Sequence, residues 1–135
     1  MEIKPNKTVV YIEDDPDMIR LVKFVFERNG FTLIGALGGC EGLRTVRRIK
    51  PDLVLLDLMM PEVDGLQVYK QMKADDELAD IPIIVVTVMG QNSDKVQRLQ
   101  VYDYVRKPFI PRELVQRVSK ALDAVDRHVW AEGDV

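Results

Sequence analysis

The sequence predicts an α/β fold in which helices cover both faces of a parallel sheet. Short runs of Val, Ile and Leu without polar alternation recur along the chain, which is typical of strands buried on both faces. Segments with apolar residues at helical spacing lie between these runs. The alternation implies parallel strands, because a crossover long enough to hold a helix joins each strand to the next. With 135 residues, the chain has the size of one domain.

Five segments are predicted as strands. The first four are short apolar runs, and the fifth is assigned because the alternation requires a strand before the last helix. In order they are Val9 to Ile12, Leu33 to Ala36, Leu53 to Leu56, Ile83 to Val86 and Tyr104 to Arg106. A doubly wound (βα)5 sheet in three layers follows from this pattern.

The first helix has both of its ends marked in the sequence. Asp15 suits the N-cap, and Pro16 suits the first helical position, where a missing N–H costs nothing. Gly30, after Asn29, suits a left-handed C-cap. The apolar stripe between these ends consists of Met18, Ile19, Val22, Val25 and Phe26. We therefore expect this helix to begin at Pro16 and to stop at Asn29.

Four further apolar stripes predict the remaining helices. In order they are Leu43, Val46 and Ile49; Leu66, Tyr69 and Met72; Val96 and Leu99; and Leu114, Val115, Val118, Leu122 and Val125. We assign residues 8–125 to the domain, 1–7 to an N-terminal extension and 126–135 to the end of the last helix and a C-terminal tail. The last five residues, Ala131 to Val135, are expected to fray.

Charge and composition narrow the choice of partners and of compartment. A net charge of -3 gives no broad basic field, so we expect no direct binding to nucleic acid or to membranes. The apolar runs are far shorter than the ~20 residues that a membrane helix needs. The single Cys40 excludes an internal disulfide, and no apolar signal region follows the polar N-terminus. These features indicate a cytoplasmic protein.

Polar side chains follow the ends of four predicted strands. Glu13-Asp14-Asp15 comes after the first strand, Asp57 after the third, Thr87 after the fourth and Lys107-Pro108 after the fifth. Ligands of open parallel sheets gather at these carboxyl ends. If the strand order is 2-1-3-4-5, the first and third strands are neighbours, and Asp14 and Asp57 lie about one strand spacing of ~4.8 Å apart.

The crowded carboxylates Glu13, Asp14 and Asp57 suggest a metal site. Like charges this close repel one another, and a cation would reverse the sign of the interaction. Few oxygen ligands with room for water suit Mg²⁺ better than Ca²⁺ or Zn²⁺, and neither His128 nor Cys40 follows a strand that reaches this pocket. The alternative is that these acidic residues only cap helices, as Asp15 does.

The side chains on the other flank of Asp57 favour phosphoryl chemistry over simple capping. The Lys107 ammonium group and a metal ion would neutralise phosphoryl oxygens, and the Thr87 hydroxyl group would donate a hydrogen bond. Asp57 would then be the attacking carboxylate, and an aspartyl phosphate would be the product.

Three motifs around these residues are specific when taken together. They are Val9-Val10-Tyr11-Ile12-Glu13-Asp14-Asp15-Pro16, Pro51-Asp52-Leu53-Val54-Leu55-Leu56-Asp57-Leu58-Met59-Met60-Pro61-Glu62-Val63-Asp64-Gly65, and Asp103-Tyr104-Val105-Arg106-Lys107-Pro108-Phe109. On these motifs, from about Thr8 to about Val125, the chain resembles a response-regulator receiver domain of two-component signal transduction, in the chemotaxis-response-regulator-like superfamily. The resemblance implies a flavodoxin-like sheet of order 2-1-3-4-5 and a cis peptide bond between Lys107 and Pro108.

The resemblance also implies a function for each site residue. Asp57 would be phosphorylated by a histidine kinase or phosphotransfer protein, with Thr87 and Lys107 contacting the phosphoryl group. Asp14, Asp57 and the Met59 carbonyl would bind Mg²⁺ directly, with Glu13 acting through a water molecule.

The resemblance implies a switch as well. Thr87 and Tyr104 would move on phosphorylation and alter the face of the fourth helix, fifth strand and fifth helix. This face would regulate a partner protein, and a homodimer formed through it is one assembly that the resemblance allows.

The sequence departs from the family pattern in two places. The segment between Thr87 and Lys107 is a couple of residues short, with Gln100-Val101-Tyr102 in place of a Gly-Ala-Asp-like turn. This departure favours one alternative, a pseudo-receiver that binds proteins without carrying phosphate. A second alternative is a metal-dependent phosphatase with an aspartyl intermediate, for which the sequence offers no substrate pocket residues. The other departure is Val88, usually a small residue, which together with Met59 would shield the phosphoryl group from water.

Several further features favour structural explanations. The glycines after the second strand fit no nucleotide-binding pattern and predict a strand-to-helix turn; they are Gly35, Gly38, Gly39 and Gly42. Four basic residues, Arg44, Arg47, Arg48 and Lys50, predict a solvated helix face. We expect Cys40 to be a small buried residue and Trp130 to pack on its own domain or anchor a partner.

Overall fold

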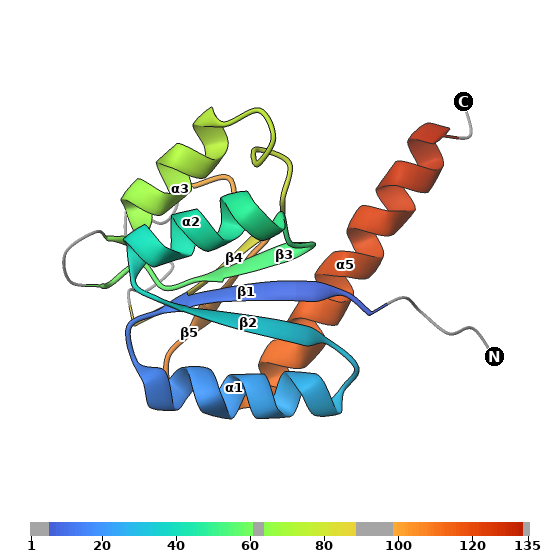
Figure 1. Cartoon of the computed structure of the whole chain (residues 1–135). Coiled ribbons are helices and arrows are strands. Elements are labelled where there is room, and N and C mark those ends of the chain that lie inside the picture. The colour runs from blue at the N-terminus through green and yellow to red at the C-terminus, as the bar shows by residue number, and fades with distance from the viewer. Residues whose placement is uncertain (1–5, 61–63, 89–98, 134–135) are drawn as a thin grey trace.

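The computed structural model describes residues 6–60, 64–88 and 99–133, with side chains described as far as residue 126. Five parallel strands form one sheet in the order β2-β1-β3-β4-β5 (Figure 1). The strands are β1 (Thr8–Glu13), β2 (Thr32–Leu37), β3 (Leu53–Leu56), β4 (Ile83–Thr87) and β5 (Asp103–Arg106). The predicted strands and the doubly wound, flavodoxin-like order are confirmed.

Helices cover both faces of the sheet and give the molecule three layers (Figure 1). The helices are α1 (Pro16–Arg28), α2 (Gly39–Ile49), α3 (Gly65–Ala74) and α5 (Pro111–Gly133). Successive residues of β1 point to opposite faces: Val10 and Ile12 pack in the core under α2 and α3, whereas Val9 and Tyr11 pack in the core under α1 and α5. Because both faces are buried, the strands read as unbroken apolar runs.

The ends of α1 lie where the sequence predicts them. The Asp15 side chain accepts hydrogen bonds from the N–H groups of Asp17, at 3.0 Å, and Met18, at 3.4 Å. Pro16 is the first helical residue, Asn29 is the C-cap, and Gly30 follows with a φ of 87°. A residue with a β carbon is strained at that φ, so glycine suits the exit from the helix.

The glycine-rich segment is more ordered than the sequence suggested. Gly35 lies inside β2, and Gly39 and Gly42 lie inside α2, so the predicted turn reduces to Gly38, whose φ is 90°. A β carbon at Gly42 would lie 2.7 Å from side-chain atoms of Ile12, so glycine there lets α2 lie close against β1.

Two other predictions are wrong, one on the burial of Cys40 and one on the end of the last helix. Cys40 is exposed rather than buried, because its position on α2 faces away from the sheet. The last helix continues to Gly133, so residues 131–133 are helical rather than frayed. The expected exposure of the basic face of α2 is confirmed.

Part of the predicted fourth helix falls outside the described residues, as does Pro61-Glu62-Val63 of the second motif. This applies to Val96 and to most of the shortened segment before Tyr104; Leu99 is described and packs against the core under α2 and α3. None of the described helices is long and apolar enough to span a membrane.

Candidate functional site

Strand register brings the predicted site residues to one edge of the sheet. Ile12 of β1 pairs with Leu56 of β3, so the residues that follow them, Glu13 and Asp57, stand side by side. The Asp57 N–H donates to the Ile12 carbonyl oxygen at 3.1 Å, which extends the ladder by one step. On the far side, Thr87 is the last residue of β4, next to β3 in the sheet.

The three carboxylates predicted at the metal site form a cluster. Oxygen atoms from the carboxylates of Glu13, Asp14 and Asp57 lie within 4.8 Å of one another. Glu13 is fully buried and Asp57 is only 3% exposed, whereas Asp14 is exposed. The cluster therefore opens to solvent on the side of Asp14.

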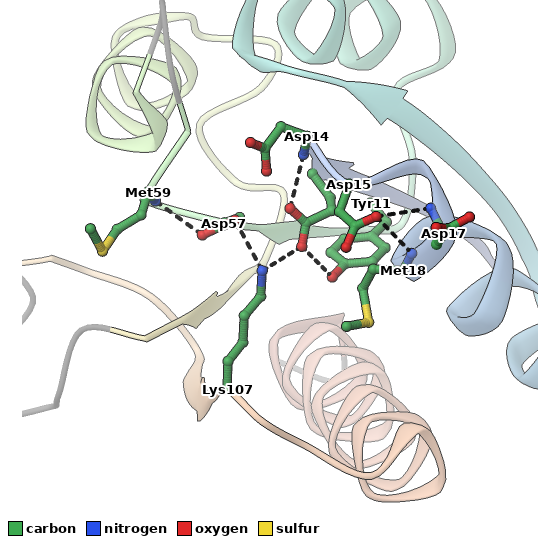
Figure 2. A network of polar contacts seen from close by, with 9 residues as sticks. Tyr11, Asp14, Asp15, Asp17, Met18, Asp57, Met59 and Lys107 are labelled. Atoms are coloured by element: carbon green, nitrogen blue, oxygen red, sulfur yellow. Dashed lines mark hydrogen bonds and ion pairs between the residues drawn. The ribbon is translucent and has the colours of Figure 1, made fainter.

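Lys107 joins the buried carboxylates (Figure 2). Its Nζ lies 2.5 Å from Glu13 Oε1 and 3.1 Å from Asp57 Oδ2. Its main-chain N–H donates to the Thr87 carbonyl oxygen at 3.0 Å, which ties the end of β5 to the end of β4. The Lys107–Pro108 peptide bond is cis, as the resemblance implied.

The loop after β3 and the start of α3 hold the carboxylate and the main chain of Asp57 in place. Asp57 Oδ1 accepts a hydrogen bond from the Met59 N–H at 3.0 Å, and the Gly65 N–H donates to the Leu58 carbonyl oxygen at 3.1 Å. A β carbon at Gly65 would lie 2.2 Å from the Asp57 carbonyl oxygen and 2.6 Å from Leu58 Cα. Glycine at this position therefore lets the start of α3 touch the backbone that carries Asp57.

The two buried carboxyl groups have opposite pKa shifts. Burial raises the pKa of Asp57 to about 6, and the charge of Glu13 adds to this rise against the hydrogen bond from Met59 and the charge of Lys107. Burial also acts to raise the pKa of Glu13, but hydrogen bonds from the Asp14 carboxyl group and Lys107 outweigh it and lower that pKa to about 2. Glu13 is therefore ionised at neutral pH.

The pKa values of Asp14 and Lys107 are also shifted by these carboxylates. The hydrogen bond with Glu13, and then burial, raise the pKa of Asp14. Burial lowers the pKa of Lys107, yet its hydrogen bonds and charge interactions with Glu13 and Asp57 outweigh burial and raise it. Three acidic groups thus face one ammonium group. This excess negative charge and a donor set of oxygen atoms alone fit a hard divalent cation such as Mg²⁺.

The remaining predicted residues lie on the neighbouring strands. Thr87 is 2% exposed at the end of β4. Tyr104 of β5 pairs in register with Val85, packs against the core under α2 and α3, and donates from its hydroxyl group to the Leu99 carbonyl oxygen at 3.3 Å. The structure thus brings four of the predicted residues next to Asp57, namely Glu13, Asp14, Met59 and Lys107. Tyr104 lies two residues before the end of β5.

Sequence reasoning missed one member of this site. Tyr11 was read only as part of an apolar strand, but its hydroxyl group donates to Glu13 Oε1 at 3.0 Å. The available signal was the spacing of two, which places Tyr11 and Glu13 on the same face of β1. That spacing alone could not show that the hydroxyl group reaches the carboxylate.

Comparisons with known proteins agree with this geometry. The family model described as a response regulator receiver domain matches residues 9–119. The DNA-binding dual master transcriptional regulator RpaA of Synechocystis sp. is 37% identical over 121 residues, which are 88% of this chain and 50% of that protein. The alkaline phosphatase synthesis transcriptional regulatory protein PhoP of Bacillus subtilis is 36% identical over 119 residues, which are 87% of this chain and 49% of that protein. The chain spans about half the length of these curated relatives.

Solved structures share the fold. The signal receiver domain of a signal transduction histidine kinase from Syntrophus aciditrophicus superposes with a TM-score of 0.81 at 27% identity, covering 90% of this chain and 93% of that one. The chemotaxis protein CheY4 of Vibrio cholerae superposes with a TM-score of 0.79, covering 87% of this chain and 99% of that one. Its identity of 18% supports similarity of fold alone.

Proposed function

Because the chain belongs to the family of response regulator receiver domains, we propose that it accepts a phosphoryl group on Asp57 from a histidine kinase or a phosphotransfer protein. The observation that carries this proposal is the setting of Asp57. This side chain is nearly buried, lies within reach of two further carboxylates, and accepts a hydrogen bond from Lys107 at 3.1 Å. A carboxylate placed next to an ammonium group is suited to attack phosphorus, because the positive charge offsets the charge that gathers on the phosphoryl oxygens.

The proposed step is a transfer between two nucleophiles. A carboxylate oxygen of Asp57 attacks the phosphorus atom, an O–P bond forms, and the P–N bond to the donor imidazole breaks. Lys107 then pairs with the transferred oxygens, and Thr87, at the end of the adjacent strand, donates its hydroxyl hydrogen bond to them. The chain acts on itself alone, so it is a phosphoacceptor rather than an enzyme with a separate substrate.

Glu13, Asp14, Asp57 and the Met59 carbonyl would hold a magnesium ion, with Glu13 acting through water. The three carboxylates with clustered oxygens support this assignment. When bound, the ion would supply positive charge that offsets the charge of phosphoryl oxygens near Asp57. The exposed side of Asp14 gives access to the cluster from solvent.

The output would be a change in the face of the fourth helix, β5 and α5, driven by Thr87 and Tyr104. Thr87 lies two positions beyond Val85, the register partner of Tyr104. The two residues are therefore on the same face of neighbouring strands, which supports a link between them. To shift the ratio of active to inactive protein from 1:99 to 99:1, the phosphoryl group must favour the active state by ~5.5 kcal/mol. A few charge-assisted hydrogen bonds to the phosphoryl group can supply this difference. The altered face would regulate a partner protein or a second copy of the chain, in the cytoplasm.

The test is phosphorylation by a small donor. We expect the protein incubated with acetyl phosphate and Mg²⁺ to gain one phosphoryl group by intact mass, and Asp57→Asn to gain none. Asp52→Asn is the matched control, because Asp52 is an exposed aspartate at the opposite end of β3, where it accepts a hydrogen bond from the Thr8 N–H. A wild-type protein that stays unmodified would overturn the proposal and favour the pseudo-receiver. Continuous release of phosphate from a small ester would favour the phosphatase.

A further inference from the structure

Tyr11 is a buried phenol aimed at a carboxylate of the site. Its side chain has 0% exposure, and it packs from β1 into the core that includes Val22 and Phe26 of α1. Its hydroxyl group donates to Glu13 Oε1 at 3.0 Å (Figure 2). An apolar residue would fill this core position without bringing a polar group that needs a partner.

Among the residues that the structure describes, Glu13 Oε1 has two donors that differ in their freedom to move. One is Lys107 Nζ, which also bonds Asp57 and lies on a flexible side chain that remains partly exposed. The other is the hydroxyl group of Tyr11, whose ring is held on all sides by the core. The second carboxylate oxygen, Oε2, accepts from the Asp14 N–H at 2.9 Å. Tyr11 is therefore the side-chain donor to Glu13 that cannot turn away.

We propose that Tyr11 is a positioning residue that keeps Glu13 oriented toward the metal-binding cluster, both in the unphosphorylated protein and when Lys107 turns to the phosphoryl group. The inference rests on the proposed function, in which Lys107 leaves part of its contact with Glu13 to pair with phosphoryl oxygens. If Glu13 lost its lysine and had no Tyr11 hydroxyl group, its contacts with the exposed Asp14 would be what remained to orient it. Outer hydrogen bonds of this kind orient metal ligands, and their removal typically weakens metal binding.

The first test is the Mg²⁺ affinity of Tyr11→Phe, measured by isothermal titration calorimetry. The substitution removes one oxygen atom and keeps the ring in the core. We expect Mg²⁺ to bind about tenfold more weakly than to wild type, as loss of an orienting partner does at other metal sites. Tyr102→Phe is the control, because Tyr102 is 43% exposed and lies outside the site; it should bind Mg²⁺ as wild type does. Affinity of Tyr11→Phe within twofold of wild type would overturn the inference.

A double-variant cycle separates positioning from a general packing effect. If Tyr11 acts through Glu13, then adding Tyr11→Phe to Glu13→Gln should cost less Mg²⁺ affinity than adding it to wild type, because the charged acceptor is already gone. An equal loss in both backgrounds would show that Tyr11 acts only through the fold, and would overturn the inference.

Two further measurements keep the test decisive. Should Tyr11→Phe melt too low for titration, the hydroxyl proton of Tyr11 in wild type is followed by NMR: the inference requires its resonance to shift when Mg²⁺ is added, and an unchanged resonance contradicts it. Phosphorylation of wild type by acetyl phosphate is scored in parallel. Failure there refutes the proposed function, whereas normal phosphorylation with an unaffected Tyr11→Phe refutes only the positioning of Glu13.

Discussion

At the scale of single residues, the site is built from two buried carboxyl groups that titrate differently. Glu13 lies among donors from Lys107, Tyr11 and the Asp14 main chain, so its negative charge is compensated. Asp57 shares Lys107 with Glu13 and also faces the charge of Glu13, so burial dominates the pKa shift of Asp57 and raises its pKa. Without a bound cation, a charge on Asp57 therefore destabilises the folded protein.

This difference predicts a pH-dependent effect of Asp57→Asn on stability in EDTA. The pKa of Asp57 rises from 3.8 to about 6 on folding, so the folded protein holds the proton more tightly than the unfolded chain. The contribution of Asp57 to the free energy of unfolding is therefore most favourable below pH 3.8, and it falls as the pH rises from 3.8 to about 6. At pH 7 we expect Asp57→Asn to be more stable than wild type by up to about 3 kcal/mol, since one pKa unit is 1.36 kcal/mol.

Urea denaturation of both proteins from pH 3.5 to pH 7, in steps of about half a unit, measures this difference. The advantage of Asp57→Asn should shrink toward the acid end, where both side chains are neutral. Glu13, whose pKa is lowered to about 2, stays ionised in the folded wild-type protein across this pH range. A variant less stable than wild type at pH 7 in EDTA would contradict the explanation.

Val88 is expected to lengthen the life of the phosphorylated state. It follows Thr87 directly, and its side chain is 54% exposed. Met59, the other apolar residue next to the site, is 51% exposed, and Figure 2 shows its side chain turned away from Asp57. Shielding of the phosphoryl group from water would therefore depend chiefly on Val88.

Val88→Ala should shorten the half-life of phosphorylated protein severalfold, followed by intact mass after removal of acetyl phosphate in the presence of Mg²⁺. Leu21→Ala, which truncates an exposed apolar residue of α1 that is 49% exposed, is the control and should leave the half-life unchanged. An unaltered half-life in Val88→Ala would end the shielding hypothesis.

At the scale of elements, helix starts and strand ends place the reactive groups. α1 begins one residue after Asp15, and α3 begins after Asp64, whose side chain accepts from the Gln67 N–H at 3.0 Å. α5 is tied to β5 by Arg117, whose guanidinium bonds both carboxylate oxygens of Asp103 at 2.9 and 3.1 Å. The two caps fix where α1 and α3 leave the edge of the sheet that carries the site. The Arg117 pair ties α5 to the start of β5, at the opposite edge.

The contact between α3 and the loop after β3 predicts a severe effect of Gly65→Ala. The added β carbon would meet the main chain of Asp57 and Leu58, which cannot rotate away as a side chain can. We expect a loss of ~1–3 kcal/mol in the free energy of unfolding, as for other overpacked sites, together with weaker Mg²⁺ binding because the backbone of Asp57 is displaced.

Gly30→Ala is the matched control for this prediction. A β carbon at Gly30 meets nothing within 4 Å, but its φ of 87° costs ~1–2 kcal/mol for a residue with a side chain. Gly30→Ala should therefore lose similar stability in urea and keep its Mg²⁺ affinity in calorimetry. Equal Mg²⁺ affinity of the two variants would show that the contact at Gly65 does not position Asp57.

At the scale of the whole molecule, the site draws its residues from β1, β3 and the ends of β4 and β5. The site residues are far apart in the sequence, and they come together because their strands pair in one sheet. The cores on both faces of the sheet hold the strands in register, so the carboxylate cluster can form only in the folded protein. Binding of a cation to this cluster must therefore stabilise the fold.

We expect Mg²⁺ to raise the melting temperature of the wild-type protein in calorimetry. At ten times its dissociation constant the ion should add ~1.4 kcal/mol to the free energy of unfolding, by mass action. Asp57→Ala should lose most of this gain, and NaCl at matched ionic strength should not reproduce it. Equal stabilisation of wild type and Asp57→Ala by Mg²⁺ would show that the ion binds elsewhere.

The sequence by itself determined the elements of this protein and the residues at the strand ends. Apolar periodicity and the caps at Asp15 and Gly30 are local properties, so they could be read without coordinates. The same reasoning placed Glu13, Asp57 and Lys107 at one edge, because parallel strands carry their ends to the same side. The strand order itself came from resemblance to a family rather than from periodicity.

Only the tertiary structure decided how these groups meet. Lys107 shares its ammonium group between two carboxylates, Tyr11 reaches Glu13 from the core, and the start of α3 at Gly65 presses on the backbone of Asp57. Cys40 is exposed although its residue type favours burial. Local patterns could not reveal these contacts, because each depends on distances between segments that are remote in the chain and are set by packing across the sheet.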